Sequence, residues 1–248
     1  MANFNPLKRQ LILLIGELGG KYNFLSPFLD VGCGSGYITL HFAKKGWSGL
    51  AVDLSEESIE QVKQAISPYK ENVAVELKNA LDVTGKFNTI FACDILEHIE
   101  GDNQFIKGLK KNMTKESKIV ITVPLYKKEW RRDDDFYGHI RRYEIEEIKE
   151  LMARNGFAIL DIWDYSYPFF WLLRRFYTRF FPKRLLGDRY TKQELTIKST
   201  LQNAYGKGIL TAILEKIICW NLIFWIQNKF SSYLMGYGCI LVGKITDE

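Results

Sequence analysis

The sequence predicts a doubly wound α/β fold with a helical insertion before the last strand. Between about residues 25 and 165, short apolar runs alternate with segments of helical period. The runs are almost continuously apolar, which is typical of parallel strands covered on both faces. A segment of different composition, 168–234, then separates the last strand from the others. We therefore expect one α/β domain made of residues 1–167 and 235–248, interrupted by an insertion at 168–234.

The elements follow from the local pattern. An apolar run at 11–15 behind Lys8 and Arg9 predicts a short amphipathic helix rather than a signal peptide, because no small-residue cleavage pattern follows it. Ser55 is expected to cap a helix, and Gly156 to follow the end of another. The expected strands are 28–31, 49–52, 73–77, 89–92, 119–123, 157–162 and 239–242, and the expected helices are 37–45, 56–67, 102–112 and 144–155.

Composition excludes several classes of protein. The chain is 47% apolar and 25% charged, as is usual for soluble globular domains. Its four cysteines are far apart and form no CxxC pair or Cys/His cluster, so we expect neither a disulfide framework nor a zinc site, and no other metal. A cytoplasmic setting is the expectation that follows.

The segment Asp30-Val31-Gly32-Cys33-Gly34-Ser35-Gly36 follows an apolar strand and opens a helix. This is the context of a nucleotide-binding loop, although a tight structural turn is the alternative. Asp53 ends the next strand, where a carboxylate can accept hydrogen bonds from both ribose hydroxyls. The third glycine is Gly36, so the spacing is GxGxG instead of the GxGxxG of dinucleotide sites. A nucleoside-containing cofactor other than NAD is therefore favoured.

These motifs resemble those of the class I S-adenosylmethionine-dependent methyltransferases, over about residues 25–165 and the final strand. The matching segments are 28–36, 51–55, 78–82, 91–98 and Val123-Pro124. The resemblance implies a mostly parallel seven-stranded sheet whose last strand is antiparallel, with S-adenosylmethionine as cofactor. It also implies cofactor contacts from Asp30, Gly32, Cys33, Gly34, Gly36, Asp53, Leu54, Asn79, Ala80, Leu81 and Asp94. The family commonly has Asp where Asn79 stands, and Asp82 is an alternative adenine contact.

Two of the three histidines are candidate catalytic groups. His98 and His139 follow the fourth and fifth predicted strands, and ligands bind at the carboxyl ends of such strands. Each is a candidate general base or substrate contact, or alternatively a hydrogen-bond partner of loop backbone. The pair Arg141-Arg142 either binds an acidic group of the substrate or pairs with the run Asp133-Asp134-Asp135. His41, on the helix after the glycine loop, is expected to be structural.

The insertion is both basic and aromatic. Residues 168–234 contain eleven basic and three acidic residues, a net charge of +8, together with fourteen aromatic residues. Three roles remain open: a lid over the substrate, peripheral contact with a membrane, or a packed subdomain or homodimer interface. Residues 208–227 are apolar, but 215–216 and Asn221 interrupt them, so a transmembrane helix is not expected.

The functional hypothesis is methyl transfer to a small, hydrophobic or amphiphilic, lipid-like acceptor. The only support for that acceptor class is the aromatic insertion. Nucleic acid is not expected as a partner, since neither an Asn/Asp-Pro-Pro-Tyr/Phe motif nor a Pro-Cys nucleophile is present. The alternatives are a non-catalytic S-adenosylmethionine-binding protein and a NAD-dependent oxidoreductase.

Overall fold

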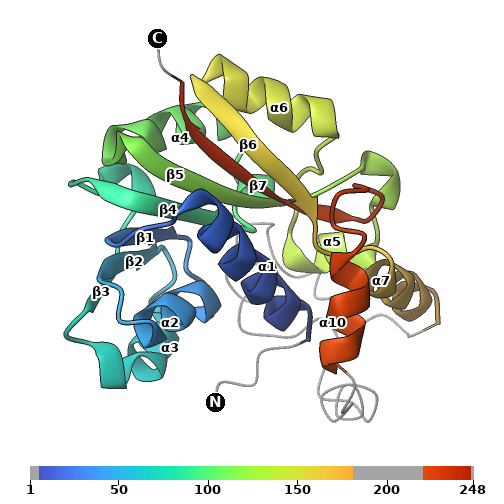
Figure 1. Ribbon diagram of the computed structural model, residues 1–248, viewed down its shortest axis with the longest axis horizontal. Coiled ribbons are helices and arrows are strands. Elements are labelled where there is room, and N and C mark those ends of the chain that lie inside the picture. The colour runs from blue at the N-terminus through green and yellow to red at the C-terminus, as the bar shows by residue number, and fades with distance from the viewer. Residues whose placement is uncertain (1–5, 181–219, 247–248) are drawn as a thin grey trace.

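Seven strands form one sheet with the order β3-β2-β1-β4-β5-β7-β6 in the computed structural model, which describes residues 6–180 and 220–246 (Figure 1). Strand β7 runs antiparallel to both β5 and β6, and the remaining pairs are parallel. The strands are β1 Phe28–Val31, β2 Gly49–Asp53, β3 Val73–Leu77, β4 Phe87–Cys93, β5 Met113–Pro124, β6 Phe157–Asp164 and β7 Gly238–Ile245. The predicted fold, including its antiparallel last strand, is confirmed.

Helices cover both faces of this sheet (Figure 1). Helices α1, α2, α3, α7 and α10 contribute to one apolar cluster, and α4 and α6 to the other. The bounds are α1 Pro6–Tyr22, α2 Tyr37–Lys44, α3 Glu56–Ala65, α4 Asp102–Leu109, α5 Arg132–Tyr137, α6 Ile145–Arg154, α7 Phe169–Phe180 and α10 Trp220–Asn228. Neighbouring residues of one strand, such as Phe28 and Leu29, belong to opposite clusters because side chains alternate across a sheet.

Aromatic side chains anchor the first cluster. Phe28, Phe42 and Phe91 are each at most 2% exposed, and the rings of Phe42 and Phe91 stack with centroids 4.6 Å apart. Burying one such side chain stabilises the fold by roughly 1.5–3 kcal/mol. This cluster fixes β1 and α2, and therefore the loop between them.

The two helix-end predictions are confirmed. The Oγ of Ser55 accepts a hydrogen bond from the backbone N–H of Ser58 at the start of α3. Gly156 follows α6 with a φ of +72°, a conformation that glycine adopts without strain.

Several elements differ from the sequence prediction. Strand β5 begins at Met113, six residues before the predicted start, because exposed polar residues extend it beyond its apolar core. Helix α4 ends at Leu109, and residues 110–112 form a 3-10 turn in which the buried Asn112 amide donates to backbone carbonyls. Helix α5 was not predicted, since its sequence is polar and only six residues long.

The two ends of the predicted insertion meet at Asp164. This buried carboxylate accepts hydrogen bonds from the backbone N–H groups of Ser166, Tyr167 and Gly236. Residues on either side of 168–234 are thus joined at one point, which is the arrangement an insertion requires. The division of the chain into domain and insertion otherwise stays a prediction, because residues 181–219 lie outside the described residues.

The described parts of the insertion pack on the α/β domain. Phe170 of α7 stacks on Trp220 of α10 with ring centroids 5.9 Å apart, and both belong to the same apolar cluster as α1. Among residues 6–180 and 220–246, no helix combines the length and apolarity needed to cross a bilayer. The apolar segment 208–227 lies outside this range except for its last eight residues.

Candidate active site

The glycine loop joins β1 to α2 through three glycines with positive φ. The φ angles of Gly32, Gly34 and Gly36 are 65°, 50° and 72°. A Cβ on Gly32 would lie 2.6 Å from Cδ1 of Ile95, and one on Gly36 would lie 2.8 Å from Cγ2 of Val62. At both positions the backbone conformation and the lack of space require glycine. The loop therefore presents backbone, with little side chain, to the adjoining cavity.

Asp53 at the end of β2 holds this loop in place. Its Oδ2 accepts from the Gly34 N–H at 2.8 Å, and its Oδ1 accepts from the Ser55 N–H at 2.9 Å. An ionised carboxylate has about four acceptor sites, so each oxygen keeps capacity for another donor. Asp53 can therefore support the loop and accept ribose hydroxyls at the same time.

Asp30 lies behind the loop. Its buried carboxylate accepts hydrogen bonds from the backbone N–H and the hydroxyl of Thr39 on α2. Burial raises the pKa of Asp30 to about 7, against the lowering effect of these two bonds. Among the residues predicted to contact the cofactor, Asp30 and Gly36 do not line the cavity. Their positions suit them to shape the loop, and direct contact with a cofactor stays a prediction.

The remaining predicted cofactor residues all line one cavity of about 810 Å³. They are Gly32, Cys33, Gly34, Asp53, Leu54, Asn79, Ala80, Leu81 and Asp94. Asn79 begins a 3-10 helix, and its side-chain carbonyl accepts from the Leu81 N–H. Asp82, the alternative adenine contact, is not part of the lining. The structure thus places Asn79, and not Asp82, in the lining of this cavity.

Both candidate histidines line the same cavity, next to Glu97. The rings of His98 and His139 meet edge to face with centroids 4.9 Å apart. The Nε2 of His139 lies 3.9 Å from Oε1 of Glu97. One potential ligand atom from each of the three side chains falls within 4.8 Å of the other two. Two imidazoles and a carboxylate at such distances can bind a cation or exchange a proton with a substrate.

Burial shifts the pKa of two members of this cluster. The pKa of Glu97 is raised well above its usual value by burial and by the nearby Asp94. The pKa of His98 is lowered to about 3, mainly by burial and secondarily by His139, against one hydrogen bond to the Gly138 carbonyl. His98 is therefore neutral at pH 7, and Glu97 favours its protonated form. Such shifts mark functional-site candidates.

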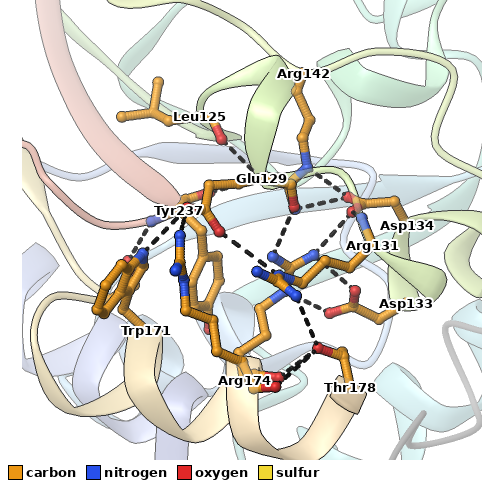
Figure 2. Close-up of polar contacts among 12 residues, drawn as sticks. Leu125, Glu129, Arg131, Asp133, Asp134, Arg142, Trp171, Arg174, Thr178 and Tyr237 are labelled. Atoms are coloured by element: carbon orange, nitrogen blue, oxygen red, sulfur yellow. Dashed lines mark hydrogen bonds and ion pairs between the residues drawn. The ribbon is translucent and has the colours of Figure 1, made fainter.

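His139 contacts Glu97 through Nε2 and, through Nδ1, an ion-pair network centred on Asp134. Figure 2 shows Asp133, Asp134, Arg142 and Arg174 of this network. The Nδ1 of His139 lies 2.8 Å from Oδ1 of Asp134, which is 1% exposed. Arg142 pairs with the same carboxylate at 2.7 Å. Arg174 of α7 donates twice to Asp133 at 2.6 Å and once to Asp134 at 2.8 Å. Burial raises the pKa of Asp134, but the hydrogen bond to His139 and the charges of Arg142 and Arg174 outweigh it and lower the pKa, so the carboxylate is ionised.

This network resolves the two interpretations of Arg141-Arg142. Arg142 pairs with Asp134, which is one of the two roles that the sequence left open for these arginines. Arg141 instead pairs with Asp102 at the start of α4, at 2.6 Å. Arg142 is 3% exposed yet still lines the cavity.

Sequence reasoning missed several cavity residues. Lys8 of α1 donates to the Ser35 hydroxyl at 2.8 Å, and burial lowers its pKa. Arg174 of α7, Tyr165 and Tyr237 also line the cavity. No motif contains them, because they come from elements outside the repeated strand–helix units. Glu97 could have been predicted as a site residue from the sequence, because it directly precedes the candidate His98 in the run 94–98.

Comparisons with known proteins agree with this geometry. Residues 6–162 match the family described as "Methyltransferase domain". This chain belongs to that family. Its methyltransferase domain therefore has the class I, Rossmann-like fold, and the cofactor of this family is S-adenosylmethionine.

Individual relatives are more distant. A ubiquinone biosynthesis O-methyltransferase of Rickettsia canadensis is 27% identical over 126 residues, covering 48% of this chain and 51% of its own. The methyltransferase thus spans about half the length of the curated relatives it matches. An S-adenosylmethionine-dependent methyltransferase structure from Clostridium acetobutylicum has a TM-score of 0.60 at 13% identity, covering 96% and 92% of the two chains. A [4+2]-cyclase, SpnF, has a TM-score of 0.59 at 16% identity and covers 96% and 82%, so this fold alone does not define a reaction.

The site fits the cofactor. The cavity adjoins a loop where a Cβ at Gly32 would collide with Ile95, and it contains the acceptor carboxylate of Asp53. Gly32, Gly34 and Asp53 would hold the cofactor's amino-acid end and ribose, and Asn79 would face its adenine. Lys8 adds a cation next to the loop.

Proposed function

We propose that the methyltransferase transfers a methyl group to a hydroxyl oxygen of a small amphiphilic acceptor. The observation that carries this proposal is the single cavity shared by the glycine loop, Asp53 and the Glu97–His98–His139 cluster. A volume of about 810 Å³ is large enough for both a nucleoside cofactor and a second ligand. The choice of oxygen draws on relatives named as ubiquinone biosynthesis O-methyltransferases.

The cofactor supplies a methyl group on a positively charged sulfur. An acceptor hydroxyl must be positioned in line with that group and must lose its proton. His139 is suited to take it: Nδ1 faces the ionised Asp134, which can only accept, so Nδ1 carries the hydrogen and Nε2 keeps a lone pair. The Asp134 carboxylate also stabilises the imidazolium that forms.

The lining of the cavity favours an acceptor with an apolar part. Leu7 and Leu11 of α1 and Ile95, Ile99 and Phe105 line it together with the polar groups described above. Arg174 of α7, within the predicted insertion, lines the same cavity. This position supports a lid role for that part of the insertion.

An exposed apolar face on α7 supports a route for such an acceptor from an anionic lipid surface. Leu172, Phe176 and Phe180 are spaced four residues apart and are 57%, 54% and 67% exposed. Residues four apart lie on one face of a helix. The positive charge of 168–234 complements anionic lipid headgroups, and apolar residues beside basic ones are typical of interfacial helices.

Methyl transfer is tested with S-adenosylmethionine carrying a labelled methyl group and a panel of alkylated catechols, simple phenols, amines and carboxylic acids. The proposal predicts label in an aryl methyl ether, with a large loss in a His139→Asn variant. Cofactor binding without transfer to any hydroxyl compound would favour a non-catalytic binding protein and would contradict the proposal.

Lipid contact is tested separately by sedimentation with anionic vesicles. Binding that weakens with added salt, and that is lost in a Phe176→Ser variant, is expected. A concentration-dependent dimer that the same substitution dissociates, without vesicle binding, would instead assign this face to a homodimer.

A further inference from the structure

We propose that Glu97, His98 and His139 form a binding site for one divalent transition-metal cation. Their potential ligand atoms lie within 4.8 Å of one another and line the cavity of the active site. Two imidazoles and one carboxylate form the protein ligand set of many catalytic zinc sites, which leave a further position open. Ligand atoms that each lie about 2.1 Å from one tetrahedral ion are about 3.4 Å apart, so the separations found here would have to shorten by up to about 1.4 Å on binding.

The orientation of both imidazoles supports this proposal. His98 hydrogen-bonds to the backbone carbonyl of Gly138, and the Nδ1 of His139 faces the ionised carboxylate of Asp134. Both partners are acceptors, so each ring carries its hydrogen on the nitrogen that faces the partner. Metal-binding histidines usually have such an acceptor behind them.

Glu97 supplies the third ligand, and one oxygen of its carboxyl group lacks a hydrogen-bond partner. It is 1% exposed, and its Oε2 has no hydrogen-bond partner in the structure. A buried carboxylate oxygen without a partner is costly, and a cation next to it would remove that cost. A cation bound in this cluster would give Oε2 the partner that it lacks.

The network of Figure 2 makes the site rigid. Asp134 is held by Arg142 and Arg174, and Gly138 caps α5 with a φ of +73°. The acceptors behind both histidines thus belong to one short segment, 134–138, that is fixed to α7 and to the sheet. Precise placement of ligands by a supporting shell is what a metal site requires.

Imidazole ligands select the type of ion. They suit zinc and other first-row transition metals, whereas Mg²⁺ and Ca²⁺ prefer sites made only of oxygen.

The catalytic role of the ion rests on the proposed function. The ion would bind the acceptor hydroxyl, and the hydroxyl proton would be released to water. The resulting oxygen anion would then form the bond to the methyl carbon as the carbon–sulfur bond breaks. His139 would serve as a ligand instead of a base in the loaded enzyme.

Metal binding is tested on the full-length chain after chelator treatment, without cofactor or acceptor. Zn²⁺ titration followed by calorimetry and Co²⁺ titration followed by visible absorption should each give one ion per chain. Excess Mg²⁺ should not compete. An Asp134→Asn variant should bind roughly 10–100-fold more weakly, because the partner behind His139 loses its negative charge. Loss of a ligand in Glu97→Gln or His98→Gln should weaken binding at least as much.

The matched control is His41→Gln, because His41 is the only histidine outside the site. This variant should keep the affinity of the parent protein. Thermal unfolding of every variant shows whether it is folded, and Glu97→Gln, which keeps the side-chain shape, stands in if a histidine variant unfolds. Absence of binding, or equal affinity in the Glu97→Gln and His98→Gln variants, would overturn the proposal.

Activity then separates this inference from the proposed function. Chelator-treated protein that regains methyl transfer with Zn²⁺ supports both. Stoichiometric metal binding at this site with no transfer to any acceptor would keep the site and refute the function. Full transfer by metal-free protein would assign activation of the hydroxyl to His139 alone and would overturn the catalytic role of the ion.

Discussion

Replacing Asp134 with asparagine removes the charge at the centre of the network that joins α5 to the insertion. The change keeps the shape of the side chain. It leaves the buried Arg142 without a carboxylate partner, although Arg142 still donates to the carbonyls of Leu125 and Tyr237. Arg174 keeps Asp133, with which it makes two bonds at 2.6 Å. One of the two arginines therefore becomes an uncompensated buried charge.

The expected loss of stability follows from this count. Breaking a buried ion pair by removing one partner costs about 3–5 kcal/mol, and carbonyl contacts offset only part of that. For a chain of this size, each kcal/mol shifts the melting temperature by roughly 2–4 °C. We therefore expect the Asp134→Asn variant to melt roughly 6–20 °C below the parent protein.

Differential scanning calorimetry measures this shift, and an exposed ion pair provides the control. Glu146 pairs with Lys149 on α6 at 2.8 Å, with side chains 77% and 45% exposed. A Glu146→Gln change should cost less than about 1 kcal/mol. Equal shifts in the two variants would refute the claim that the buried network stabilises the contact between insertion and active site.

Two further predictions concern buried charges around the glycine loop. Burial raises the pKa of Asp30 to about 7, so between pH 4 and 7 the folded state binds a proton that the unfolded state has lost, and stability falls as pH rises through this window. Relative to an Asp30→Asn variant, the parent protein should lose roughly 2 kcal/mol of unfolding free energy between pH 5 and 7 in urea titrations, and parallel curves for the two proteins would contradict this. A Lys8→Met variant should bind S-adenosylmethionine roughly 10–100-fold more weakly by calorimetry, since it loses a charged donor beside the loop. Lys21→Met is its control, because Lys21 lies on the same helix but pairs with Asp161 outside the cavity, and an equal effect of both changes would remove Lys8 from the cofactor site.

Strand–helix periodicity was enough to predict the sheet, and the spacing of the glycines was enough to predict the loop after its first strand. Apolar runs give strands wherever both faces are covered, and the loop residues Gly32 to Gly36 are adjacent in the sequence. For the same reason, local motifs identified Asp53 and Asn79 as well as the loop. The start of β5 was missed because its exposed residues break the apolar pattern.

The rest of the site depends on contacts between distant segments. Arg174 reaches Asp134 across 40 residues, and Lys8 reaches Ser35 across 27. No metal site was predicted, because the cysteines and histidines are not clustered in the sequence. His139 joins Glu97 and His98 only when α5 folds back against the end of β4. Such pairings follow from topology, which a local pattern does not contain.

Titration of the intact chain with S-adenosylmethionine and S-adenosylhomocysteine, beside an Asp53→Ala variant, tests the central claim most directly. The structure predicts one site per chain in the parent protein. In the variant, the loss of the ribose acceptor and of the bond to the Gly34 N–H should greatly weaken binding. Thermal unfolding should confirm that the variant remains folded. Absence of binding by the parent protein, or equal affinity in the folded variant, would contradict the claim that this cavity is an S-adenosylmethionine site.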